Sequence, residues 1–300
     1  MKIDTSMYVL LTACLLALIL PIDASAFKPA VIYILCVILV LSSKQLSFQM
    51  PTRRELKITV KLFFTNYALT SSVLVALGFI YPSYAVGFWL LALVPPAINV
   101  IPFSNLLGGD TRSAVFAELL SFVSALVIAP ALAYLLLKQS IDISLLVKTM
   151  SIALIIPLCA AYFVKKTEKK LGSIPFSSEI TTFGNAAIFF IIISSSRLTL
   201  FDAAKHASFW AMILVFIALK VVVSFILRYV LARSSKREMV DFLLFSIFKN
   251  TGLAAGLVAV LDVVPMSTLP IAVDSAFFAI YFMFTHWLLS RKVVIRKHTA

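Results

Sequence analysis

The chain has 300 residues, of which 62% are hydrophobic and only 13% are charged, and its formal net charge is +13. A soluble globular domain carries about 25% charged residues, so the composition excludes a soluble enzyme or binding domain and predicts a polytopic membrane protein. The positive charge does not indicate a nucleic-acid partner, because basic loops that fix membrane topology explain it. The three cysteines stand alone inside apolar runs and predict neither a metal site nor a disulfide framework.

Apolar runs of about 20 residues recur along the chain, and each can cross a bilayer as a helix. In chain order we predict ten spans, at residues 7–20, 29–43, 59–81, 84–107, 112–137, 144–165, 179–196, 207–232, 239–262 and 266–290. The first run also resembles a secretory signal that ends in Ala-Ser-Ala at residues 24–26. We expect it to be retained, because the repeat described below requires ten spans.

Most of the basic residues in the predicted loops lie on the side of the membrane that holds both chain termini. Cytoplasmic loops carry an excess of lysine and arginine. The charge pattern therefore predicts a multi-pass protein of the cell (inner) membrane with both termini in the cytoplasm.

Two of the predicted spans are interrupted at matching positions. The segment PPAINVIPFSNLLGG (95–109) interrupts the fourth span, and FKNTG (248–252) interrupts the ninth. Each is the fourth span in a set of five, and because five is odd, the second set starts from the opposite face. We therefore predict two inverted repeats, at residues 1–143 and 144–300, whose broken helices cross near the midplane. This pattern is typical of secondary transporters, although proline kinks that only shape the packing are the alternative.

Three stretches resemble the bile acid:sodium symporter family. The stretch AINVIPFSNLLGGDTRSAVFAELL is similar to its fourth and fifth helices, and SIFKNTGLAAGLVAV is similar to its helix-nine signature. The start of the third helix is similar as well, with Asn66 as the polar amide of the family. The matching residues in the first two stretches are Ala97, Asn99, Val100, Gly109, Asp110, Asn250, Leu253 and Ala254.

The resemblance implies an all-α fold of ten helices. A core of helices 3–5 and 8–10 would carry the crossed broken helices, and a panel of helices 1, 2, 6 and 7 would face it. It also implies transport of organic anions together with sodium.

The chain departs from the family at the residues that bind sodium there. Phe245 and Lys249 stand in place of a glutamate and a glutamine, Ile98 in place of a serine, and Glu118 in place of a threonine. Sodium needs several oxygen ligands, whereas phenylalanine and isoleucine have none in their side chains and lysine only donates hydrogen bonds. We therefore predict that the chain does not use these sodium sites, and we expect no bound metal and no cofactor.

A lysine in the middle of a bilayer costs about 2.5–3.5 kcal/mol on insertion scales, so Lys249 is expected to be paired or functional. Our hypothesis is that its ammonium takes the place of the missing cation, with Glu118 and Asn99 as partners. Such a pair could act as a proton switch, or it could be a permanent structural pair in a uniporter. Asp274 is predicted either to pair with Lys220 or to carry the proton itself.

The sequence thus predicts a secondary transporter of a small organic anion that works by alternating access. Candidate substrate- and ion-site residues are Lys249, Asn250, Thr251, Asn99, Glu118, Asn66, Asp274, Ser104 and Asn105. The alternatives are a sodium-independent uniporter, an auxin-carrier-like exporter, and a channel or sensor; a membrane enzyme lacks support, because no nucleophile–base constellation is present. The expected partners are the organic anion, protons and the lipid bilayer but no nucleic acid, and the oligomeric state is left open.

Overall fold

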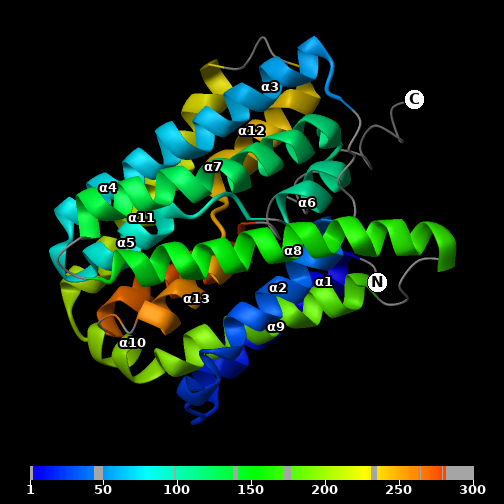
Figure 1. The fold of residues 1–300 in the computed structure, drawn as a ribbon. Helices are drawn as coiled ribbons and strands as arrows, with labels where there is room; N and C mark the ends of the chain where they lie inside the picture. The colour runs from blue at the N-terminus through cyan, green and yellow to red at the C-terminus, as the bar shows by residue number, and fades with distance from the viewer. Residues whose placement is uncertain are drawn as a thin grey trace, which may run out of the picture.

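The computed structural model describes residues 3–43, 50–97, 99–137, 141–171, 177–230, 235–261, 263, 265–278 and 280–281. The regular elements within these ranges are helices (Figure 1). They are α1 (Ile3–Ile19), η1 (Ser25–Phe27), α2 (Ala30–Ser43), α3 (Arg53–Phe64), η2 (Thr65–Thr70), α4 (Ser71–Ile80), η3 (Pro82–Tyr84), α5 (Ala85–Leu93), α6 (Val100–Leu107), α7 (Thr111–Leu137), α8 (Ile143–Leu171), α9 (Ser177–Ser195), α10 (Arg197–Ala203), α11 (Ala207–Val230), α12 (Lys236–Ile247), α13 (Thr251–Leu261) and η4 (Pro265–Ser267).

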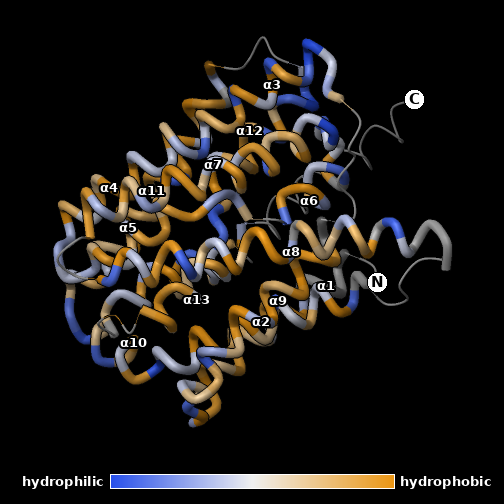
Figure 2. The backbone as a smooth tube through the Cα atoms, viewed as in Figure 1, coloured by the Kyte–Doolittle hydropathy of each residue, from blue (hydrophilic) through white to orange (hydrophobic). Residues whose placement is uncertain are grey.

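The predicted all-helical membrane class is confirmed. Four described helices are long and apolar enough to cross a membrane, and a fifth span results if α9 and α10, which are bent by 55°, are counted together. Shorter apolar helices lie within other predicted spans, and hydrophobic residues cover most helices along their length (Figure 2). The last of these is Thr268–Phe278, and the end of the tenth predicted span, residues 282–290, lies outside the described residues. The ten-span inverted repeat stays a prediction.

Both predicted interruptions are present. The helix α5 ends at Leu93, and Val94 is extended (φ −75°, ψ 149°) in front of two prolines. A residue that precedes proline is driven out of the helical region, which explains why the helix ends there. In the second interruption α12 ends at Ile247 and Phe248 is extended (φ −95°, ψ 113°), before α13 begins at Thr251.

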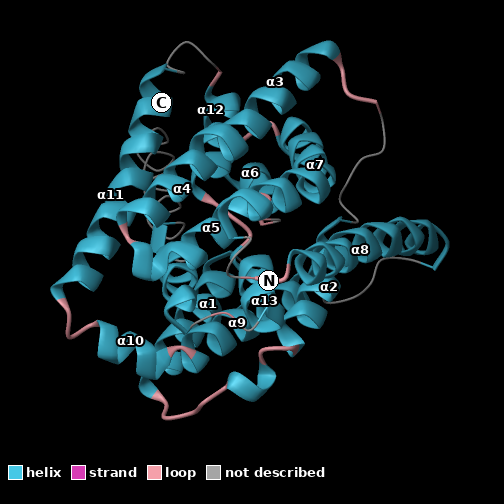
Figure 3. Ribbon diagram, turned by 60° about the vertical axis from the view of Figure 1, so that its left-hand side comes forward, coloured by secondary structure: helices cyan, strands magenta, loops and turns pink. Residues whose placement is uncertain are grey.

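The two interruptions meet inside the helical bundle. Pro96 and Lys249 form an antiparallel bridge. In this bridge the Asn250 N–H donates to the carbonyl oxygen of Pro95 (2.9 Å), and the Ala97 N–H donates to that of Phe248 (3.3 Å). Figure 3 shows loop segments in the interior, between helices. Each break thereby satisfies backbone groups of the other, as non-helical backbone at membrane depth requires.

The helix contacts indicate which helices lie side by side. The helix α1 packs against α9, and α2 packs against α8 and α9. Elsewhere α3 packs against α7, α4 against α5, and α11 against α12, while α13 contacts α2, α5 and α8. The division into a panel and a core, and the repeat boundary between residues 143 and 144, stay predictions.

Candidate functional site

Lys249 lies where the two broken helices cross, with none of its surface exposed. Its Nζ donates to Oδ1 of Asn66 (2.8 Å) and to Oγ of Ser71 (2.9 Å). It also lies 3.0 Å from the carbonyl oxygen of Val94 and 3.4 Å from that of Ala92. An ammonium has three N–H donors, so these four oxygens satisfy it without a carboxylate.

Two of these oxygens belong to the carbonyl end of α5. Ala92 is in its last turn, and Val94 follows its last residue. The carbonyls in the last turn of a helix have no partner inside the helix, and prolines 95 and 96 have no N–H to offer them. A helix end of this kind carries about half a negative charge, which a cation stabilises. Lys249 therefore acts as a cap of the half-helix α5.

Asn66 and Ser71 reach the crossing from a π-helical turn, η2, and from the residue that follows it. Asn66 Nδ2 donates to the carbonyl oxygen of Phe245 (2.9 Å), and Thr70 Oγ1 donates to that of Ser246 (2.9 Å). Ser71 Oγ donates to the carbonyl oxygen of Ala92 (2.8 Å). These side chains thus serve the carbonyl ends of both α5 and α12. Isolated π-turns inside membrane helices are frequent at functional sites.

Among the described contacts, Lys249 makes no direct hydrogen bond or ion pair with its predicted partners Glu118 and Asn99. The ammonium is drawn to the oxygens of η2, Ser71 and α5, and the ring of Tyr67 faces it, with Nζ 4.8 Å from the ring centroid. Glu118 on α7 is 1% exposed, and neither of its carboxyl oxygens has a hydrogen-bond partner among the described residues. It stays within electrostatic range of Lys249 and Tyr67. The crossing therefore holds a satisfied ammonium and an unsatisfied carboxyl group.

Two further candidates lie at the second break itself. Asn250 is 4% exposed, and its Oδ1 accepts a hydrogen bond from the Leu253 N–H (2.9 Å), which caps the start of α13. Its Nδ2 has no hydrogen-bond partner among the described residues. Thr251 is buried as the first residue of α13. The crossing therefore offers one free, buried amide donor.

The three candidates from the first break, Asn99, Ser104 and Asn105, make no hydrogen bond to Lys249 among the described contacts. Asn99 is half-buried at the start of α6, where its side chain makes no capping hydrogen bond. Asn105 is exposed, and the buried Ser104 donates to Asp241 near the end of α6. Ile98, one of the departures from the family pattern, lies outside the described residues.

Asp274 pairs with Lys220, which was the first of its two predicted roles. The two side chains form a buried ion pair, and both are less than 5% exposed. Lys220 Nζ also donates to the carbonyl oxygen of Ile247 (2.8 Å), the last residue of α12.

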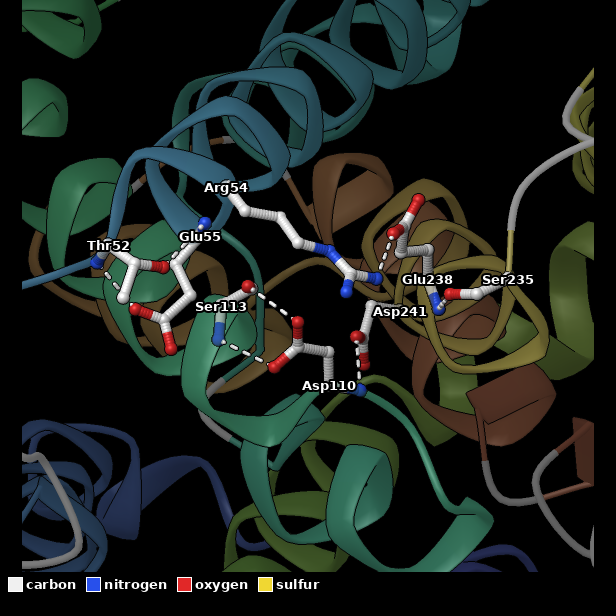
Figure 4. Close-up of polar contacts among 8 residues, drawn as sticks. All are labelled: Thr52, Arg54, Glu55, Asp110, Ser113, Ser235, Glu238 and Asp241. Carbon is white, nitrogen blue, oxygen red and sulfur yellow. Dashed lines mark hydrogen bonds and ion pairs between the residues drawn. The ribbon is translucent and has the colours of Figure 1, made fainter.

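A second polar cluster, which the sequence did not predict, ties the starts of α3, α7 and α12 together. Figure 4 shows its members, which are Thr52, Arg54, Glu55, Asp110, Ser113, Ser235, Glu238 and Asp241. Asp241, which is fully buried, accepts hydrogen bonds from Ser104 Oγ (2.5 Å) and from the Asp110 N–H (2.7 Å). At its exposed edge Arg54 forms an ion pair with Glu238 (2.9 Å). This cluster links the end of α6 to α12, away from Lys249.

Comparison with known proteins finds one family. The sequence model of the Sodium Bile acid symporter family matches residues 5–233, which is more than half of the chain. The match includes Asn66, Glu118 and Lys220, and it ends before α12 and the break that carries Lys249. No curated protein matches the chain.

Proposed function

This chain belongs to the sodium bile acid symporter family, and we propose that it is a secondary transporter that carries a small organic anion by alternating access and without sodium. The observation that supports this proposal is the buried ammonium of Lys249 at the crossing of the broken helices. We place the protein in the cell membrane with both termini in the cytoplasm, on the distribution of its basic residues.

The independence from sodium follows from the occupants of the crossing. The oxygens of Asn66, Ser71, Ala92 and Val94 are already used by Lys249. The fixed ammonium of Lys249 would also repel a sodium ion that approached these oxygens. Phe245, which is fully buried, offers no side-chain oxygen. A lysine of the protein thus does permanently what a bound cation would do only when present.

The preference for an anion follows from the charges and donors at the crossing. The pair of Lys220 and Asp274 is neutral, and Lys249 has no carboxylate within ion-pair distance among the described residues. The helices α6 and α13 begin at the crossing, so their positive dipole ends add to the charge of Lys249. The free Nδ2 of Asn250 adds a hydrogen-bond donor for a carboxylate.

Coupling to protons is supported by Glu118. As long as this carboxyl group is ionised, it cancels the charge of Lys249, and the crossing has no net charge for an anion. Once it binds a proton, the crossing carries one positive charge. A proton and a monovalent anion therefore favour the binding of each other, which is the requirement for symport.

The test uses purified protein in sodium-free liposomes with a panel of radiolabelled monocarboxylates that includes pyruvate and benzoate. We expect saturable uptake that a proton gradient drives and that added sodium does not increase. Glu118→Gln holds the position neutral, so this variant should still exchange labelled for unlabelled anion but should lose accumulation driven by the gradient.

The possible results separate the alternatives. A requirement for sodium would contradict the proposal. Wild-type uptake that ignores the proton gradient, with unchanged behaviour of Glu118→Gln, would instead establish a sodium-independent uniporter. Absence of saturable uptake for every carboxylate tested would argue against an organic-anion carrier.

A further inference from the structure

The last carbonyl oxygens of α12, like those of α5, lack hydrogen-bond donors from their own helix. In a continuous helix the Thr251 N–H would donate to the carbonyl oxygen of Ile247, four residues earlier. Here it donates to the carbonyl oxygen of Lys249 instead (2.8 Å). The Asn250 N–H, which would serve Ser246, donates to Pro95 (2.9 Å). The end of α12 therefore needs donors from outside its own helix.

Three side chains from other helices supply these donors. Asn66 and Thr70 serve the carbonyl oxygens of Phe245 and Ser246, and both come from η2. The third carbonyl, that of Ile247, is served by Lys220 from α11 at 2.8 Å. Because Lys220 provides the only charged donor among the three, its hydrogen bond is the strongest kind available to this helix end.

The surroundings of Lys220 keep its ammonium in place. The ion pair with Asp274 anchors it to the helix Thr268–Phe278. The rings of Phe216 and Phe277 face Nζ at 4.9 Å and 5.5 Å from their centroids. The ammonium is thus neutralised by a carboxylate and covered by aromatic rings, and it is directed at Ile247.

We propose that Lys220 is a positioning residue, whose ammonium holds the carbonyl end of α12 and thereby fixes the bridge that carries Lys249 and Asn250. Lys249 caps the half-helix α5 and Lys220 caps the half-helix α12, so each broken helix has its own internal cation. Asp274 is the counter-ion that makes the buried charge of Lys220 tolerable. The consequence for transport rests on the proposed function, whereas the positioning of the bridge does not.

Hydrogen–deuterium exchange by mass spectrometry tests the positioning without any substrate. The variant K220M/D274N removes the ammonium and its counter-ion together, so that no unpaired charge is left buried. We expect the amide hydrogens of a peptide that spans residues 247–252 to exchange at least about tenfold faster, because the bridge loses its support at Ile247. The comparison variant is D274N alone, which keeps the ammonium next to Ile247 but removes its counter-ion. The unpaired charge should raise exchange in α11 and in the helix Thr268–Phe278, whereas the exchange of the 247–252 peptide should rise by less than about threefold.

The same variants separate positioning from simple packing. If the ion pair only holds α11 to the helix Thr268–Phe278, D274N and K220M/D274N will increase exchange in those two helices alike and leave residues 247–252 protected. That result would overturn the proposal. Uptake by K220M/D274N in liposomes is the second readout, and we expect a rise in the KM for the carboxylate of at least about tenfold, since the anion site is displaced. If the wild-type protein shows no carboxylate uptake, the proposed function is refuted, but the exchange result on the position of the bridge remains valid.

Discussion

At the scale of single residues, the two buried lysines differ in what neutralises them. Lys220 contacts a carboxylate, whereas the hydrogen-bond acceptors of Lys249 are neutral oxygens. Neutral oxygens satisfy the N–H donors of Lys249 but do not cancel its charge, which in the proposed function only ionised Glu118 does. The charge available to an anion therefore resides on Lys249, and Lys220 serves the backbone.

The oxygen shell of Lys249 can be tested at Ser71. Ser71→Ala removes one acceptor of the ammonium and one donor to the carbonyl oxygen of Ala92, both of them buried. We expect the free energy of unfolding to fall by about 1–3 kcal/mol, the usual cost of leaving buried polar groups without partners. Thermal unfolding of the purified protein in detergent measures the change.

The matched control for this variant is Ser275→Ala. Ser275 is as deeply buried, but its hydroxyl only donates to Ile271 in its own helix (2.8 Å). The stability of this variant should change by less than about 1 kcal/mol. Equal losses in the two variants would mean that Ser71 contributes packing alone and does not hold the ammonium.

The sequence identifies the polar residues that are unfavourable in a bilayer better than it identifies their contact partners. Lys249 and Asn66 stand out because a charge and an amide in apolar runs need a reason. Ser71 and Thr70 do not stand out in the sequence, because hydroxyl residues are common in membrane helices, where they pack helices by hydrogen bonds. Which oxygens reach the ammonium depends on the register between η2 and the second break. That register is set by tertiary packing, which is why the sequence did not predict that neutral oxygens, and not the Glu118 carboxyl group, contact the ammonium directly.

At the scale of helices, the breaks were predictable and the bends were not. Two prolines in one run, and Asn-Thr-Gly after a lysine in the other, interrupt the helices as the sequence indicates. The π-turn Thr65–Thr70 contains no proline or glycine, and its side chains donate hydrogen bonds to α12. The 55° bend between α9 and α10 occurs next to three serines, whose hydroxyls donate to backbone or to Thr268.

In the loop between α6 and α7, Gly109 packs closely against the side chains of Asp241 and Ser104. A Cβ atom at Gly109 would lie 2.4 Å from Asp241 Oδ1 and 2.6 Å from Ser104 Oγ. Gly109→Ala must therefore push Asp241 away from its two donors and detach the end of α6 from α12. We expect a loss of stability of at least about 2 kcal/mol, since a buried carboxylate loses its hydrogen bonds. Thermal unfolding measures the loss, together with deuterium exchange of residues 104–110.

Gly108→Ala separates this steric effect from backbone strain. Gly108 has a left-handed conformation (φ +74°), and a Cβ added there meets no atom within 4 Å. The cost at this position should be about 1–2 kcal/mol of strain, with the Asp241 contacts intact. A loss in Gly109→Ala no larger than that in Gly108→Ala would show that the cluster around Asp241 does not hold α6.

At the scale of the whole molecule, α13 connects the crossing to the helices that pack outside it. The helix α13 begins at Thr251, directly after Lys249 and Asn250, and packs against α2 and α8. Two glycines, Gly252 and Gly256, face Leu35 and Ile32 of α2 at close range. Small residues of this kind let membrane helices approach closely and present a smooth surface. If α2 belongs to the panel of an alternating-access transporter, this contact is where the panel must slide past the core.

A disulfide across this contact tests whether such sliding is needed. A Cβ at Gly256 would lie 2.7 Å from Ile32 Cγ1 and 4.0 Å from Ile32 Cα. Two cysteines at these positions therefore come near the Cβ separation of about 3.5–4.5 Å that a disulfide requires. In a background where Cys14, Cys36 and Cys159 are replaced by alanine, we expect oxidised I32C/G256C liposomes to lose carboxylate uptake and to regain it after reduction with dithiothreitol. The single variants I32C and G256C, treated with the same oxidant, are the controls for damage by oxidation and for the substitutions themselves. Full uptake by protein that is shown to be cross-linked would mean that α2 and α13 move as one body, and the panel would then have to be drawn without α2.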